Sequence, residues 1–171
     1  MPEPEIAVDA DGASKHHATH GFAQGLKSGL PIFLGYLPVG AAFGVVSRQA
    51  GFSVLQAASC SALALAGAGQ FIGLSLYESG ATVLAVLVAS SVVNLRYVLF
   101  GATLVPMMRG IRLPTQAGLA FFLTDETYAV NVLELRSARA TAASMAGVGV
   151  IAWTGWVLGT TAIWKGDNAP W

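Results

Sequence analysis

The stretch QAGFSVLQAASCSALALAGAGQFIGLSLY, from Gln49 to Tyr77, contains 29 residues and no charged side chain. Two further runs without charge extend from Ser28 to Ser47 (20 residues) and from Ala140 to Trp164 (25 residues). A helix rises about 1.5 Å per residue, so about 20 apolar residues cross a hydrocarbon core roughly 30 Å thick. These three runs are therefore long enough to cross a membrane.

The composition supports a membrane protein and excludes other classes. Hydrophobic residues make up 54% of the chain, charged residues make up 11%, and the mean hydropathy is +0.62. Soluble domains carry about a quarter charged residues, so this chain has too few to cover a surface in water. The net charge is zero and there is no basic stripe, which argues against nucleic acid as a partner. The single cysteine, Cys60, offers neither a disulfide framework nor a metal cluster.

Two more regions have the length of a membrane segment but contain charge. Arg96 interrupts residues 81–108, and Asp125 and Glu126 interrupt residues 113–133. With these regions included, we predict an all-α, polytopic transmembrane helical bundle of about five segments, some of them broken helices. The segments are expected at about residues 29–46, 54–77, 82–105, 114–133 and 142–163, forming one transmembrane domain over residues 21–171.

Local signals refine these boundaries. Residues 1–20 are polar and lack the pattern of a signal peptide, so a disordered tail is expected there, with its histidines in water rather than on a metal. Pro38 lies inside the first segment and predicts a helix kink, because proline removes a backbone donor and clashes with the preceding turn. Ser53 and Gln56 form a capping-box pattern, which predicts a helix start just after Ser53.

Glycine pairs recur at a spacing of four, and one of them, Gly69/Gly73, begins in a stretch that is also polar. Gly40/Gly44 and Gly155/Gly159 are typical of close helix packing. The sequence Gly67-Ala-Gly69-Gln70 lies near the middle of the second segment, where two glycines weaken a helix by about 1 kcal/mol each. It is either an unwound stretch that binds a polar substrate or a close helix crossing with Gln70 hydrogen-bonded across it.

Polar side chains in the third segment suggest a site inside the membrane. Ser90, Asn94 and Tyr97 line up on one side of a continuous helix, and Arg96 lies nearly opposite Asn94. An arginine at this depth costs at least about 2.5–3.5 kcal/mol, so we expect protein or water around it rather than snorkelling to an interface. In the fourth segment, Asp125 and Glu126 are either a partner for Arg96 and a proton carrier, or part of a turn at an interface.

Enzyme chemistry finds no support in the sequence. There is no glycine-rich phosphate loop, no Ser/His/Asp arrangement and no zinc spacing. All three histidines precede the membrane segments, so an intramembrane hydrolase would lack a histidine base. We therefore expect a protein that is not an enzyme, with no cofactor, no metal and no catalytic residues.

Four short motifs, in order, resemble the AzlC-type large subunit of branched-chain amino-acid exporters. They are Gly29-Leu-Pro31 with Gly35-Tyr-Leu-Pro38 and Ala42-Phe43-Gly44; Ala66-Gly-Ala-Gly-Gln-Phe71; Asn94-Leu-Arg-Tyr97; and Phe122-Leu-Thr-Asp-Glu126. Together they extend over most of the chain. Members of that family continue well past the fifth segment, so the resemblance implies a short or truncated member.

The resemblance implies a secondary transporter of the bacterial inner membrane, spanning it several times. It exports leucine, isoleucine, valine and similar neutral amino acids together with a small hydrophobic AzlD-type subunit. On the physical reading, the substrate-binding residues are Gly67, Gly69, Gln70, Asn94 and Arg96, and Asp125 or Glu126 carries a coupling proton. Two other classes stay open: a non-transporting structural subunit of a membrane complex, and an ion or proton channel.

Overall fold

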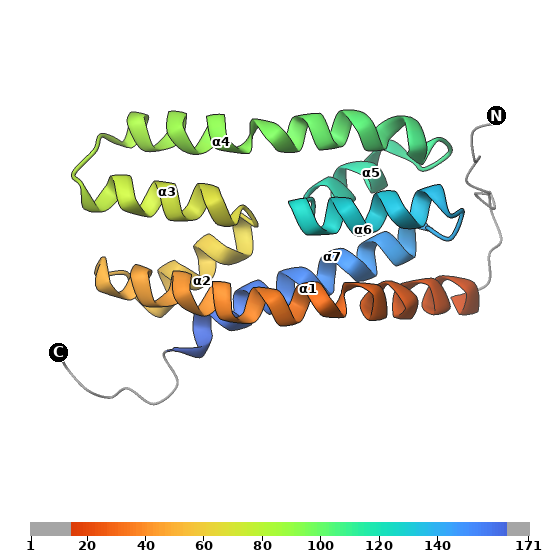
Figure 1. The fold of residues 1–171 in the computed structure, drawn as a ribbon, viewed down its shortest axis with the longest axis horizontal. Coiled ribbons are helices and arrows are strands. Elements are labelled where there is room, and N and C mark those ends of the chain that lie inside the picture. The colour runs from red at the N-terminus through yellow and green to blue at the C-terminus, as the bar shows by residue number, and fades with distance from the viewer. Residues whose placement is uncertain (1–14, 164–171) are drawn as a thin grey trace. The chain divides into compact units, whose positions relative to one another are not determined.

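The computed structural model describes residues 15–163, and the side chains from residue 21 onward. These residues form an all-α transmembrane helical bundle, as predicted. The helices, in chain order, are α1 (Lys15–Gln49), α2 (Val54–Leu63), α3 (Gly67–Glu78), α4 (Val83–Leu104), the 3₁₀ turn η1 (Val105–Met108), α5 (Leu113–Ala120), α6 (Asp125–Arg136) and α7 (Ala142–Ala162) (Figure 1).

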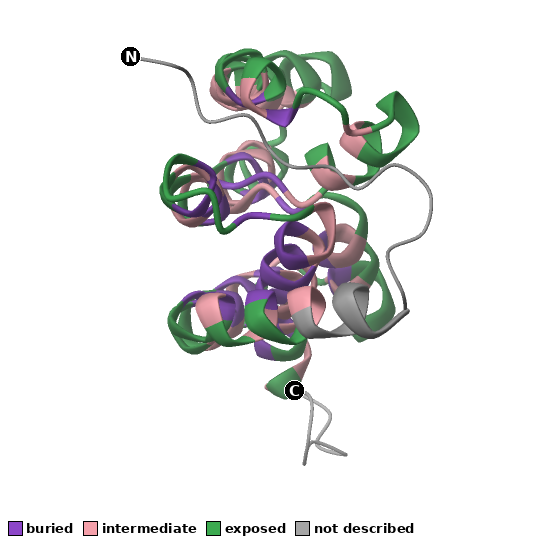
Figure 2. Cartoon of the chain, turned by 90° about the vertical axis from the view of Figure 1, so that its right-hand side faces the viewer, coloured by how far each residue is buried: buried purple, intermediate pink, exposed green. Residues whose placement is uncertain are grey.

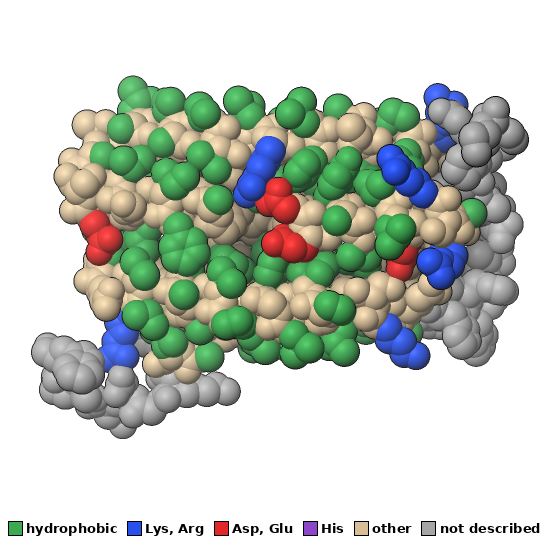
Figure 3. Space-filling model, viewed as in Figure 1, with side chains coloured by type: hydrophobic (Ala, Val, Ile, Leu, Met, Phe, Trp, Pro, Cys, Tyr) green, Lys and Arg blue, Asp and Glu red, His purple; other side chains and the backbone are tan. Residues whose placement is uncertain are grey.

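Within the described part of the chain, three helical stretches are long and apolar enough to cross a membrane. They are Gly21–Gln49, Val83–Met108 and Ala142–Ala162. In the stretch Val83–Met108, which contains α4, no residue of the most apolar window is buried. Figure 2 shows many exposed residues along the helices. Hydrophobic side chains also dominate the face drawn in Figure 3, with few charges among them. Such a surface requires contact with hydrocarbon or with another apolar chain.

The chain divides into two compact units that share the three long helices. Unit 1 contains the start of α1, the second part of α4, α5, α6 and the start of α7, whereas unit 2 contains the remainder of α1 and α7 with α2, α3 and the first part of α4. The boundaries fall after Ile32, Arg96 and Ala152. Each unit therefore contains one pair of short helices.

In unit 2, the predicted second segment is two helices rather than one. The capping box of Ser53 and Gln56 is present and α2 begins at Val54, as the sequence predicted. However, α2 ends at Leu63 and α3 begins at Gly67. The rings of Phe52, before α2, and Tyr77, near the end of α3, have centroids only 5.4 Å apart. The chain thus reverses at the break and forms a helical hairpin, which differs from the single segment expected at residues 54–77.

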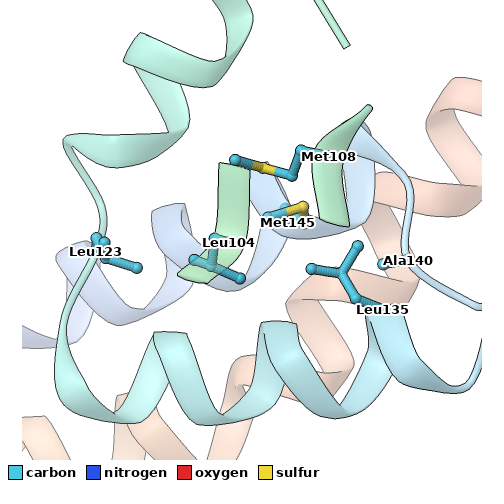
Figure 4. Packing of buried hydrophobic residues seen from close by; sticks show 6 residues of the cluster. All are labelled: Leu104, Met108, Leu123, Leu135, Ala140 and Met145. Carbon is cyan, nitrogen blue, oxygen red and sulfur yellow. The ribbon is translucent and has the colours of Figure 1, made fainter. Parts of the chain in front are cut away.

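Unit 1 contains a second hairpin in place of the single segment expected at residues 114–133. Here α5 ends at Ala120 and α6 begins at Asp125, and the two helices run in opposite directions (Figure 1). Met108, shortly before α5, and Leu135, near the end of α6, share one buried apolar cluster with Ala140 (Figure 4). Because residues just before α5 and near the end of α6 meet in this cluster, the end of α6 lies on the same side as the start of α5.

Glycines hold α1 and α7 close together in unit 2. A Cβ added at Gly40 would lie 2.6 Å from the carbonyl oxygen of Trp156, and Gly44 faces Thr160 in the same way. From α7, a Cβ at Gly155 would lie 2.8 Å from the carbonyl oxygen of Phe33. These contacts confirm the packing role predicted for Gly40/Gly44 and Gly155/Gly159.

The N-terminal part of α1 follows the same pattern within unit 1. Gly25 faces the backbone of Ser144, and Gly29 faces that of Val148, so α1 and α7 run in the same direction there. The helix begins at Lys15, which places residues 15–20 of the expected tail in α1, whereas residues 1–14 lie outside the described part. Pro38 lies inside α1 on an exposed face, and the kink expected there stays a prediction.

Candidate functional site

The break between α2 and α3 leaves an open helix terminus inside unit 2. Ala66 is the N-cap residue of α3 and supplies no side-chain hydrogen bond. The first hydrogen bond of the helix runs from the Gln70 N–H to the Ala66 carbonyl at 2.9 Å. The N–H groups of the preceding turn have no intrahelical acceptor, so partial positive charge gathers at this end. The first turn of α3 contains no acidic residue to compensate it.

Gln70 is fixed in place directly beside this terminus. Its side chain is 7% exposed, and its Oε1 accepts a hydrogen bond from the Trp156 Nε1 of α7 at 2.8 Å. Its Nε2 lies 3.4 Å from the Cys60 Sγ of α2, which accepts weakly. The sequence posed an unwound stretch and a cross-helix bond of Gln70 as alternatives. In unit 2 Gln70 makes the cross-helix bond, and Gly67–Gln70 form the first turn of α3; the non-helical residues are 64–66, directly before this sequence, and substrate binding there stays a prediction.

Gly69 and Gly67 are small because neighbours occupy the space a side chain would need. A Cβ at Gly69 would lie 2.7 Å from the Asn94 Nδ2, and one at Gly67 would lie 2.9 Å from the Cη2 of Trp156. Ser90 donates to the Gly69 carbonyl at 3.3 Å. Ser90 and Asn94 therefore face α3 together, which confirms their predicted placement on one side of the helix.

Asn94 brings an unused acceptor to the start of α3. Its Oδ1 is buried and has no hydrogen-bond partner among the residues that the structure describes. Arg96, two residues along α4, is half-buried and is the last residue of that helix assigned to unit 2. Unit 2 thus contains all five predicted substrate-binding residues: Gly67, Gly69, Gln70, Asn94 and Arg96. The structure packs Gly69 against Asn94, and the binding role of the set stays a prediction.

The break between α5 and α6, in unit 1, has the opposite character. Thr124 caps α6: its Oγ1 accepts from the Thr127 N–H at 3.2 Å, and the Thr127 Oγ1 accepts from the Thr124 N–H at 2.8 Å. Asp125, half-buried, and Glu126, exposed, occupy the first turn of the helix. Carboxylates are stabilised there by the helix dipole. This terminus is therefore both capped and acidic.

The predicted pairing of Arg96 with Asp125 or Glu126 joins residues from different units and stays a prediction. The alternative, in which Asp125 and Glu126 are part of a turn, differs from the structure: the break ends at Thr124, and both carboxylates lie in the first turn of α6. Residues 113–133 are thus divided just before the two carboxylates.

Sequence reasoning missed a polar face on α6. Thr127, Asn131 and Glu134 are each less than a tenth exposed. Their spacing of four and then three places them on one helix face, which is a signal present in the sequence. The fourth segment was predicted to end at residue 133, one position before Glu134, so the third member of this polar face lay outside it. Ser28 of α1 donates to this carboxylate at 2.5 Å.

Comparison with known proteins shows the family. Residues 31–163, most of the chain, match the AzlC protein family. The chain belongs to the AzlC family. It is 32% identical to the inner membrane protein YgaZ of Escherichia coli over 142 residues, covering 81% of this chain and 58% of that protein. An uncharacterised membrane protein of Archaeoglobus fulgidus is 33% identical over 139 residues, covering 81% of this chain and 59% of that protein.

A more distant AzlC relative has a functional name. The branched-chain amino acid transport protein AzlC of Bacillus subtilis is 26% identical over 102 residues, which cover 60% of this chain and 40% of that protein. The chain spans less than two thirds of the length of each of these relatives. No solved structure matches the chain.

Proposed function

We propose that this AzlC-family chain forms part of a secondary transporter that exports branched-chain or similar neutral amino acids. Family membership carries the proposal, since a Bacillus subtilis relative is named as a branched-chain amino acid transport protein. The two hairpins, each formed by a membrane segment that breaks into two helices, support the proposal. Such discontinuous helices place helix ends and unpaired backbone groups where a polar substrate can bind.

The substrate in this proposal is a zwitterion with an apolar side chain. Its carboxylate binds at the open N-terminus of α3, where the N–H groups of Gly67 to Gly69 are available, or at the Arg96 guanidinium. Its ammonium group binds carbonyl oxygens near Gly67–Gln70 or a carboxylate. The unused Asn94 Oδ1, which packs against Gly69, is a further acceptor for the ammonium group in unit 2.

Proton coupling is assigned to the first turn of α6. Asp125 and Glu126 are adjacent carboxylates about 100° apart around the helix, so they face different surroundings. Asp125 is half-buried and Glu126 is exposed, which is consistent with such a difference. One of them takes up and releases the coupling proton during export.

The working transporter in this proposal contains a second chain. A small hydrophobic AzlD-type subunit binds beside this protein in the bacterial inner membrane. The unburied surface of α4 supports the need for further apolar contact, whether from lipid or from such a subunit. A structural subunit and an ion channel are the competing functions that the following experiment separates from export.

Export of labelled leucine from preloaded bacterial cells tests the proposal. Cells that express this chain together with a neighbouring AzlD-type gene should lose label faster than cells with an empty vector. A structural subunit would give no such difference even when the chain is present in the membrane. A channel would change ion conductance in vesicles without leucine export, and either result would contradict the proposal.

A further inference from the structure

Glu134 is a buried carboxylate with only part of its hydrogen-bonding capacity used. It is 7% exposed and lies two residues before the end of α6, in unit 1. Its Oε1 accepts a hydrogen bond from the Ser28 Oγ of α1 at 2.5 Å. Its Oε2 is buried and has no hydrogen-bond partner among the described residues. An ionised carboxylate in this position requires a compensating positive charge.

A second unused oxygen lies one helical turn away. Asn131 is 6% exposed, and its Oδ1 is also buried without a hydrogen-bond partner in the part of the chain that the structure describes. Residues three positions apart on a helix are neighbours on its surface. Glu134 and Asn131 therefore present two oxygen acceptors on the same face of α6.

The surroundings intensify the negative potential at Glu134. The C-terminal end of a helix carries partial negative charge, and Glu134 lies in the last turn of α6. The nearest basic residues along the chain are Arg136 and Arg139, and Lys27 precedes Ser28 on α1; all three are exposed. Helix α7, which contributes Met145 to the apolar cluster of this unit, contains no charged or histidine side chain.

We propose that Glu134 and Asn131 form a binding site for one sodium ion. Carboxylate and amide oxygens are the ligands that hard cations prefer, and a single carboxylate balances a single positive charge. Glu134 also lies in the last turn of α6, where the partial negative charge of the helix C-terminus favours a cation. Ser28 orients the carboxylate by binding its Oε1, which leaves Oε2 for the ion. The site goes beyond amino-acid export and does not depend on it.

Thermal unfolding of the purified full chain in detergent tests the site without any transport measurement. Sodium chloride is titrated against potassium chloride at constant ionic strength and constant pH. We expect a saturable rise in melting temperature with sodium alone. At a sodium concentration of about 100 times Kd, the folding equilibrium should shift about 100-fold towards the folded state.

Two substitutions locate the effect. Glu134→Gln keeps the shape of the side chain and removes its charge, so the response to sodium should disappear. Glu78→Gln is the matched control, because Glu78 is an exposed acidic residue at the end of α3, and its response should equal that of the wild type. If Glu134→Gln does not fold, Ser28→Ala replaces it, and we expect the sodium concentration at half-saturation to rise about tenfold or more.

Three results would overturn the sodium site. Sodium and potassium could stabilise the wild type equally, which would indicate a general salt effect. The response could persist unchanged in Glu134→Gln or in Ser28→Ala. Stability could also follow pH and show no dependence on sodium, which would make Glu134 a proton-binding group instead. A wild type that exports leucine yet gives any of these results would leave the proposed function intact.

Discussion

The two helical hairpins have the same construction and opposite chemistry. In each, a short helix ends, three or four residues break the chain, and a helix of twelve residues returns. The returning helix α6 starts with a Thr124 cap and two carboxylates, whereas α3 starts with Ala66, which has no capping side chain, and two glycines. The N-terminus of α6 is capped by a side chain of its own hairpin. The N-terminus of α3 leaves its N–H groups for another molecule.

The geometry of a break therefore does not by itself determine what it binds. An uncapped terminus without acidic residues favours anions, whereas the two carboxylates at the start of α6 repel an anion and are groups that can carry a proton. We assign the substrate carboxylate to α3 and the proton to α6 on that basis. Substitutions that exchange or remove these features test the assignment.

The largest effect is expected from Arg96→Ala. If Arg96 pairs with Asp125 or Glu126 as predicted, its removal leaves a carboxylate without compensation. Because Arg96 and Asp125 are half-buried, the cost is at most that of a fully buried pair, about 3–5 kcal/mol. We expect loss of export or loss of folded protein in the membrane, measured by leucine export and by the amount of protein extracted in folded form. Exposed Arg112→Ala is the control and should change little. Normal export and stability in Arg96→Ala would remove both roles from the arginine.

Neutral substitutions in the first turn of α6 should abolish coupling and spare the substrate site. Asp125→Asn or Glu126→Gln fixes the proton-carrying group in a neutral form, so gradient-driven export should stop while downhill exchange continues. Wild-type export should depend on pH and collapse when the proton gradient is dissipated. The double substitution decides between carrier and structural roles, since full gradient-driven export in it would leave the pair no part in coupling.

Glycine-to-alanine substitutions in the two hairpins should shift stability in opposite directions. Gly69→Ala forces the new methyl group against Asn94, and such overpacking costs about 1–3 kcal/mol. A Cβ added at Gly118 of α5 would meet no neighbouring atom within 4 Å, so Gly118→Ala should stabilise the helix by up to about 1 kcal/mol. For a chain of this size, each kcal/mol moves Tm by about 2–4 °C. Equal shifts in the two variants would show that Asn94 yields easily.

The sequence predicted the helices well because the signals for them are local. Charge-free runs predicted α1 and α7, and the capping box placed the start of α2 at the correct residue. The glycine pairs predicted close helix packing, and the structure shows it between α1 and α7. Each of these features depends on residues within a few turns of one another, so no knowledge of distant contacts was needed.

The reversals at the two breaks could not be predicted in the same way. Residues 54–77 have the length and hydropathy of one crossing. Gly67 and Gly69 indicate a weak point in the helix, but nothing local shows that the chain reverses its direction there. The contact of Phe52 with Tyr77 decides this, and it joins residues far apart in the sequence. The buried state of Glu134 also depends on a distant residue, because Ser28 of α1 is its hydrogen-bond donor.

The most direct test of the comparison comes from giving α3 the character of α6. Ala66→Asp supplies the missing cap and a negative charge, since aspartate at an N-cap accepts from the second or third N–H of the helix. Stability should rise by about 0.5–2 kcal/mol. Export should fall, because the new carboxylate occupies the groups assigned to that of the substrate.

Ala66→Asn separates capping from charge. Asparagine offers the same hydrogen bond without the charge, so it should stabilise α3 similarly and reduce export less than Ala66→Asp. Thr124→Ala is the reciprocal change, and it should lower stability by about 1 kcal/mol through loss of the cap on α6. If Ala66→Asp raises stability and still exports at the wild-type rate, the N-terminus of α3 can be capped without loss of export. The substrate carboxylate would then have to bind elsewhere, with Arg96 as the remaining group proposed for it.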